Sequence, residues 1–177
     1  ITQSNHPIRF PRTVRNEATG GSWPRDPDGF YHLPTDWPAN WPAFGVSWHD
    51  AVRFAEWKTQ QARAQGLPHT YRLPILTEFR LAAKGNTLWD YPYGSDFRPI
   101  WSNCCFSRPK PEPEPVLRYP LDASIFDIYD CSGSALEWVN AWWDQDHIKR
   151  FAAGGSWAQG GATAAKPAAG LGIRPNS

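Results

Sequence analysis

Eleven tryptophans and eighteen prolines within 177 residues constrain the fold of this chain more than any other feature. Proline removes a backbone donor and breaks helices and central strands. Tryptophan carries a large apolar area with a single N–H donor. Few long segments show the periodicity of a helix or a strand. We therefore expect a core assembled from loops and aromatic side chains rather than from long helices.

Length and charge set the broad class. The chain is long enough to bury a core as one domain. Eighteen Lys and Arg oppose seventeen Asp and Glu, so the net charge of +1 creates no broad field that would attract nucleic acid or an anionic membrane. No run of eighteen apolar residues occurs, which argues against membrane insertion. The chain starts at Ile1 and has no Met or signal peptide, so we expect a fragment or processed chain of unknown localisation.

The three cysteines are Cys104, Cys105 and Cys131. An odd number argues against a secreted scaffold built on disulfides. The favoured interpretation is free thiols in a reducing compartment such as the cytoplasm. A bridge from Cys104 or Cys105 to Cys131 is the alternative. Zinc is not expected, because the chain has no second Cys pair and no His pair at ligand spacing.

Two helices are expected. Ser47 is a good N-cap for a helix over about 48–65, with Asp50 three residues later, and Gly66 and Pro68 end it. A second helix is expected within 73–85, with Gly85 as its stop.

Short strands are expected at 126–130, 136–142, 149–153 and 171–175. Residues 1–43 are expected to be irregular, with a turn at 26–29 and with Trp23, Trp37 and Trp41 fixing the segment to the body. The alternating Pro and Glu residues of 110–115 predict extended polyproline or a solvated turn.

Five segments in a fixed order resemble the formylglycine-generating-enzyme, or sulfatase-modifying factor, family. They are Phe44–Ala51, Tyr71–Gly85, Tyr91–Gly94, Phe126–Trp138, and Arg150–Trp157 with Gly172–Arg174. The resemblance implies an α+β fold of the C-type-lectin type, with two helices, small antiparallel sheets and much irregular loop. It also implies a single domain over residues 1–177, with the start of the domain lying before residue 1.

The departures from the family pattern concern its chemistry. Gln159 and Ala164 stand where the resemblance places the two catalytic cysteines. Copper(I) is a soft ion that thiolates suit, and these two side chains cannot replace thiolates. We therefore expect no copper or iron, and we favour a non-catalytic domain over an enzyme. Ile75 also replaces the family's Thr at the second helix entry, which removes a cap worth about 1 kcal/mol unless Thr77 takes over.

The resemblance also implies calcium. The ligands would be Asp130, the carbonyl oxygens of Gly133 and Ala135, and Glu137, a set of oxygens that suits a hard cation. The alternative is an empty loop in which Glu137 accepts backbone hydrogen bonds. Asn103 matches a ligand of the family's other calcium site, although its companions are not recognisable.

Other catalytic arrangements find little support. His49, His69 and His147 are isolated, without a nucleophile elbow or a pair at metal spacing. A sulfoxide-synthase-like protein would need three histidines on a helical bundle that this chain lacks, so the chain would be at most the accompanying half. A sensor domain of a larger protein such as a kinase is a further alternative.

Segment 150–175 is the expected ligand-binding surface, because its small side chains form a shallow surface on which few side-chain rotamers need to be ordered. One branch of this fold, the bacterial or phage variable proteins of diversity-generating retroelements, varies this stretch. Adenine mutagenesis of AAC-type codons yields Ala, Gly and Thr, which abound here, although Gln159 and Lys166 fit less simply. We expect a non-catalytic display domain for a protein or cell-surface ligand. The predicted binding residues are Trp142, Trp143, Ala153, Trp157, Ala158, Gln159, Ala162, Thr163, Ala164, Lys166 and Ala168.

Overall fold

The computed structural model describes residue 27 and residues 38–176. Most of these residues belong to two compact units. The first holds residues 43–73 and 174–176, together with 27, 38 and 39; the second holds residues 40–42 and 74–173. The predictions for Trp23, Trp37 and the turn at 26–29 lie outside the described residues, whereas Trp41 is half-buried.

The first unit is built around helix α1, Trp48–Ala64, as predicted. Ser47 caps it, because its Oγ accepts the Asp50 amide N–H at 3.2 Å and donates to the Asp50 carboxylate at 2.7 Å. The buried face carries Ala55, Thr59 and Ala62. The Thr59 hydroxyl donates to the Ala55 carbonyl and accepts the Tyr71 N–H at 2.8 Å. The segment that follows the helix is thereby fastened to the same face.

The second unit contains helix α2, Leu76–Lys84, which also agrees with the sequence. Ile75 has no side-chain acceptor, so its cap comes from Glu78, whose Oε2 accepts the Ile75 N–H at 2.9 Å. The Glu78 half of a capping box is therefore present, while the side-chain acceptor that a Thr at position 75 would offer is missing. Gly85 ends the helix with φ at +66°, a conformation that favours glycine.

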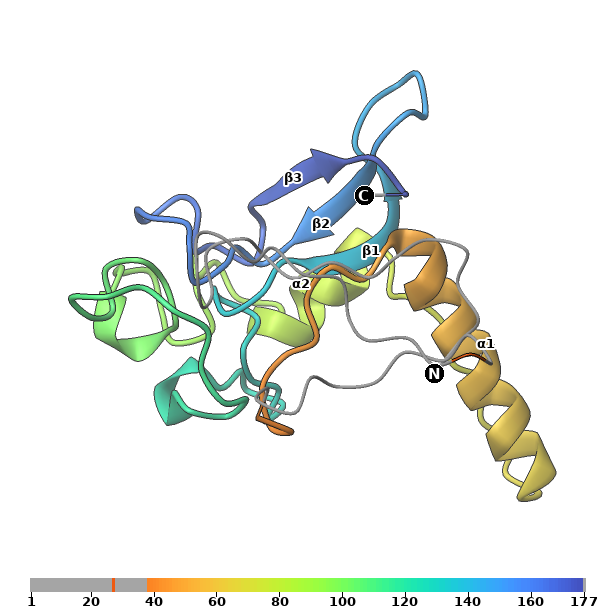
Figure 1. The fold of residues 1–177 in the computed structure, drawn as a ribbon. Helices are drawn as coiled ribbons and strands as arrows, with labels where there is room; N and C mark the ends of the chain where they lie inside the picture. The colour runs from red at the N-terminus through yellow and green to blue at the C-terminus, as the bar shows by residue number, and fades with distance from the viewer. Residues whose placement is uncertain (1–26, 28–37, 177) are drawn as a thin grey trace. The chain divides into compact units, whose positions relative to one another are not determined.

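A three-stranded antiparallel sheet completes the second unit, with strands in the order β1 (Glu137–Trp142), β2 (Arg150–Ala153) and β3 (Gly170–Ile173). Figure 1 shows the strands side by side, with α2 next to β1. The register pairs Glu137 with Ala153 at one end of β1 and Trp142 with Arg150 at the other. The core lies between sheet and helix and consists of Phe79, Ala83, Cys131, Val139 and Ala153.

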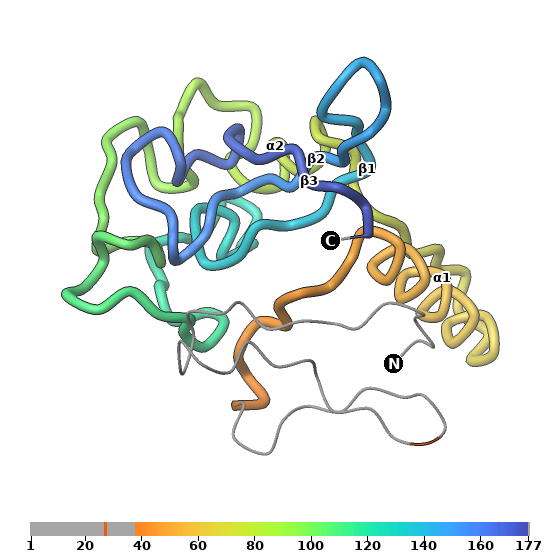
Figure 2. The backbone as a smooth tube through the Cα atoms, turned by 45° about the horizontal axis from the view of Figure 1, so that its top comes forward, coloured from red at the N-terminus to blue at the C-terminus, as the bar shows by residue number. Residues whose placement is uncertain are grey.

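The predicted strand at 126–130 is wrong. Asp127 and Asp130 have φ angles of 55° and 63°, which extended backbone does not allow. The Ser124 hydroxyl accepts the N–H groups of Phe126 and Ile128, so a local turn satisfies donors that a strand would pair. Figure 2 shows the chain between α2 and β1 as irregular loop, in which the short 3₁₀ turns are Pro99–Trp101 and Pro120–Asp122.

The architecture is therefore α+β, with two helices, one small sheet and much irregular loop, as expected. All three cysteines are free, with Cys104 and Cys131 buried, so the alternative of a bridge to Cys131 is wrong. In the part of the chain that is described, we find no helix with the length and apolar character needed to cross a membrane.

Candidate functional site

The loop of residues 154–169 joins β2 to β3 and contains most of the predicted binding residues. We call it the β2–β3 loop. Gly154 and Gly155 open it with φ angles of +93° and +78°. A Cβ at Gly155 would overlap the Ala164 carbonyl oxygen, so only glycine lets the loop fold back on itself there. The Gly154 N–H donates to the Ala169 carbonyl at 3.2 Å, which closes the base of the loop.

The body holds this loop by its main chain. In Figures 1 and 2 the loop lies beside the segment around residues 90–110. Four loop carbonyl oxygens, spaced three residues apart, accept hydrogen bonds from groups outside the loop. The pairs are Cys105 N–H to Gln159 (3.1 Å), Tyr91 Oη to Ala162 (2.7 Å), Ser132 Oγ to Ala165 (2.6 Å) and Arg80 Nη2 to Ala168 (3.2 Å). None of these four bonds uses a loop side chain.

The loop side chains divide into an exposed and an anchoring set. Ala158, Ala162, Thr163 and Ala168 are exposed, as a binding surface requires. Gln159, Ala164 and Lys166 are half-buried, and the Lys166 ammonium pairs with Asp90 at 2.8 Å. Lys166 therefore fastens the loop to the body rather than facing a ligand freely.

Two predicted binding residues are buried. Ala153 is 0% exposed within the core, and Trp157 is 5% exposed, with its backbone N–H donating to the Ser134 carbonyl. Since a buried side chain cannot contact a ligand on the surface, the structure assigns both residues to packing. The last two residues of β2, Ala152 and Ala153, are both buried, so this end of the strand lacks the alternation that would leave one of them on the surface.

Trp142 and Trp143 are exposed, but they lie at the far end of the sheet from the β2–β3 loop. Trp142 pairs with Arg150, whereas the loop leaves the sheet after Ala153, which pairs with Glu137. The Arg150 guanidinium lies 3.4 Å from the centroid of the Trp142 ring, and His147 stacks on that ring at 4.9 Å. The structure therefore does not bring the two tryptophans together with the loop.

One thiol does approach the loop. A Cβ at Gly160 would lie 2.5 Å from the Cys105 Sγ, next to Gln159, one of the two positions where the resemblance leads us to expect catalytic cysteines. Cys131 lies in the core instead, where burial and the negative charges of Glu137, Asp122 and Asp130 raise its thiol pKa. Sequence reasoning missed the placement of Cys105, because no local pattern links residues 105 and 160.

The predicted calcium loop gathers negative charge. Burial, together with the charges of Asp130 and Glu137, raises the pKa of Asp122 to about 9, although the Ser132 N–H opposes the shift. Asp122 is 1% exposed and its Oδ1 has no partner. Glu137 is exposed, yet the protein atoms around its carboxyl group and the negative charge of Asp130 raise its pKa as well.

These groups suit a cation electrostatically, since a buried carboxylate is costly without a compensating charge. Asp130 has one oxygen engaged, because its Oδ2 accepts the Leu117 N–H at 2.9 Å. Within residues 27 and 38–176, no three His, Cys, Asp or Glu side chains converge as a metal cluster. Asp130 and Glu137 would need the Gly133 and Ala135 carbonyls to complete a calcium site, so the calcium site stays a prediction.

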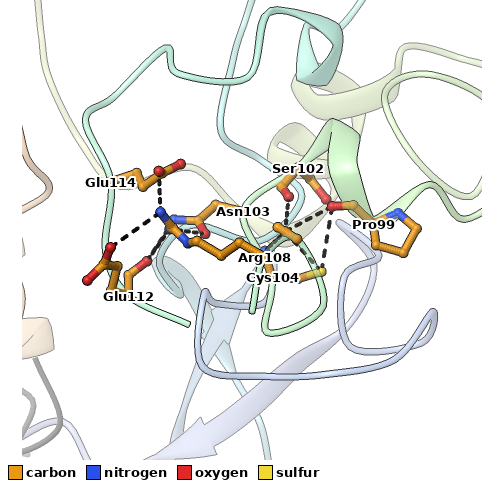
Figure 3. Close-up of polar contacts among 8 residues, drawn as sticks. Pro99, Ser102, Asn103, Cys104, Arg108, Glu112 and Glu114 are labelled. Atoms are coloured by element: carbon orange, nitrogen blue, oxygen red, sulfur yellow. Dashed lines mark hydrogen bonds and ion pairs between the residues drawn. The ribbon is translucent and has the colours of Figure 1, made fainter. Parts of the chain in front are cut away.

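Asn103 contacts an arginine. Its side-chain oxygen accepts a hydrogen bond from the Arg108 guanidinium at 3.2 Å (Figure 3). The second calcium site, which the resemblance implies at Asn103, stays a prediction.

Comparison with known proteins places the fold. A model of the sulfatase-modifying factor enzyme 1-like domain matches residues 2–175. The formylglycine-generating enzyme of Thermomonospora curvata is 29% identical over 140 residues, which cover 73% of this chain and 42% of that enzyme. The aligned region thus spans less than half the length of this curated relative.

Three solved structures share the fold. Treponema denticola variable protein 1 matches with a TM-score of 0.61 and 18% identity, covering 82% of this chain and 70% of that one. CarF matches with a TM-score of 0.63 and 22% identity, covering 89% of this chain and 67% of that one. PvdO from Pseudomonas aeruginosa matches with a TM-score of 0.65 and 16% identity, covering 97% of this chain and 64% of that one. Identities this low establish a common fold and nothing about activity.

Proposed function

We propose that this chain, which belongs to the family of sulfatase-modifying factor enzyme 1-like domains, is a non-catalytic domain that displays β2–β3 loop side chains to a ligand. The carrying observation is the spacing of the four carbonyl anchors at Gln159, Ala162, Ala165 and Ala168. A loop held by its main chain keeps its shape when its exposed side chains change.

The exposed residues support this proposal. Ala158, Ala162, Thr163 and Ala168 are small and exposed, and substitutions at such sites usually change stability by less than about 0.5 kcal/mol. The ligand we propose is a protein or another cell-surface molecule. One structure of the same fold is named a variable protein, and we extend diversification to this chain as part of the proposal. A near-copy of the loop codons beside a reverse-transcriptase gene would support that part.

The binding proposal is tested by a library randomised at the four exposed positions and selected against a panel of proteins and glycans. The matched control randomises Trp142, Trp143, His147 and Ile148, exposed residues at the far end of the sheet. We expect specific binders from the loop library and few from the control. Equal yields from both libraries would contradict a specialised loop surface.

A second candidate is an oxidase of unusual ligation, which the position of Cys105 against Gly160 favours. Copper(I)-loaded protein incubated with a cysteine-containing sulfatase peptide tests it by mass spectrometry of the peptide. Formylglycine that disappears in Cys105→Ser would replace the display proposal with an enzyme. Unchanged peptide would leave the display proposal as the better account.

A further inference from the structure

The Arg108 guanidinium lies inside a ring of oxygen atoms from three residues (Figure 3). Its Nη2 donates to the Asn103 side-chain oxygen at 3.2 Å and to the Glu112 carbonyl at 2.6 Å. Its Nη1 pairs with the Glu114 carboxylate and lies 3.7 Å from the Glu112 carboxylate. Amide, carbonyl and carboxylate oxygens are the donors that calcium takes from proteins.

This cluster is partly withdrawn from water. The side chains of Arg108 and Glu114 are each 18% exposed and Asn103 is 3% exposed, whereas the Glu112 side chain is 43% exposed. A charge at such depth needs an opposite charge and satisfied hydrogen bonds. Without a cation between them the Glu114 carboxylate and the more exposed Glu112 carboxylate would repel each other, and the Arg108 guanidinium supplies that positive charge.

We propose that Arg108 is a built-in substitute for a bound metal ion, so that segment 102–114 is ordered without metal and becomes a calcium site only when the guanidinium is removed. The donors fit a hard cation, but the chain supplies the cation itself. The family's expected ligand at Asn103 is thereby converted from a metal ligand into an acceptor for arginine.

The ring supports the frame of the β2–β3 loop. The Asn103 carbonyl accepts the Ser134 N–H at 2.7 Å, and the Ser134 carbonyl accepts the Trp157 N–H at 3.0 Å. A Cβ at Gly133 would overlap the Asn103 carbonyl oxygen, so the two segments are in close contact. A displacement of Asn103 caused by loss of the Arg108 contacts would therefore be transmitted to the start of the β2–β3 loop through these two hydrogen bonds.

The test counts calcium ions bound per chain by equilibrium dialysis, with Arg108→Ala against the unchanged protein. Arg98→Ala is the control, because Arg98 forms a 3.7 Å ion pair with Asp96 in which both side chains are more than half exposed. We expect Arg108→Ala to bind one calcium ion more than the other two proteins. Adding Glu114→Gln to Arg108→Ala is expected to abolish the extra ion.

Arg108→Lys keeps the positive charge and is expected to bind no extra ion; extra calcium in this variant would overturn the proposal. If Arg108→Ala fails to fold in chelator, its refolding on addition of calcium is the expected result. Failure to fold in either condition, or a folded Arg108→Ala that binds no more calcium than the unchanged protein, would also overturn it.

Discussion

Replacing Ser132 by alanine tests whether the body holds the β2–β3 loop through its main chain. Ser132 is 0% exposed and donates to the Ala165 carbonyl at 2.6 Å; Ala165 is itself 2% exposed. The substitution leaves a carbonyl that water cannot readily reach, and an unsatisfied buried acceptor costs about 1–3 kcal/mol. We expect the free energy of unfolding to fall by about 2 kcal/mol.

The assay is urea denaturation followed by tryptophan fluorescence, together with hydrogen exchange of the loop amides. Exchange is needed because the loop could open locally without global unfolding. Thr163→Ala, at an exposed loop position, is the control and should change the free energy of unfolding by less than about 0.5 kcal/mol. If Ser132→Ala changed neither the unfolding free energy nor the exchange rates, the reasoning about carbonyl anchors would be refuted.

Three further predictions concern the turn and the acidic residues. Gly155→Ala should lower stability by about 1–3 kcal/mol more than Gly161→Ala, measured by denaturation; both positions have positive φ, but only Gly155 faces a carbonyl oxygen. In chelator, stability should fall as pH rises from about 4 to 9, because folding raises the pKa of Asp122 from 3.8 to about 9 and the folded state binds that proton more tightly. Asp122→Asn should flatten this dependence of stability on pH. An unchanged slope in the variant would show that another group causes the dependence. If the predicted calcium site exists, calcium should raise the melting temperature of the unchanged protein but not of Glu137→Gln, and equal shifts in both would exclude Glu137 as a ligand.

The sequence predicts those parts of the fold that local contacts determine. Ser47 and Gly85 mark helix ends because capping involves neighbours within a few residues. A strand was wrongly predicted at 126–130 because apolar residues alternate there as they do in a strand. The segment instead forms a turn, in which the Ser124 hydroxyl accepts a backbone N–H and Asp127 and Asp130 have positive φ.

The site depends on contacts between distant residues, which one sequence does not reveal. The loop anchors Tyr91, Ser132 and Arg80 lie 71, 33 and 88 residues from their carbonyl partners. Strand register places Trp142 away from the loop, and no pattern near residue 105 predicts its approach to Gly160. Ala158, Ala162, Thr163 and Ala168 are exposed as a binding surface requires, whereas Ala153 is in the core, because the size of a side chain does not say which face of the chain it lies on.

Thermal unfolding of one multiple variant tests the display proposal most directly. The variant replaces the four exposed residues together, as Ala158→Tyr, Ala162→Asn, Thr163→Tyr and Ala168→Asn, and it is compared with the single buried change Ala165→Tyr. At up to about 0.5 kcal/mol per exposed site and about 2–4 °C per kcal/mol, the four changes together should lower the melting temperature by less than about 8 °C. Ala165→Tyr, which overfills a buried position, should abolish cooperative unfolding or lower the melting temperature further. A fourfold variant that unfolds as readily as Ala165→Tyr would contradict the claim that the loop keeps its shape independently of its exposed side chains.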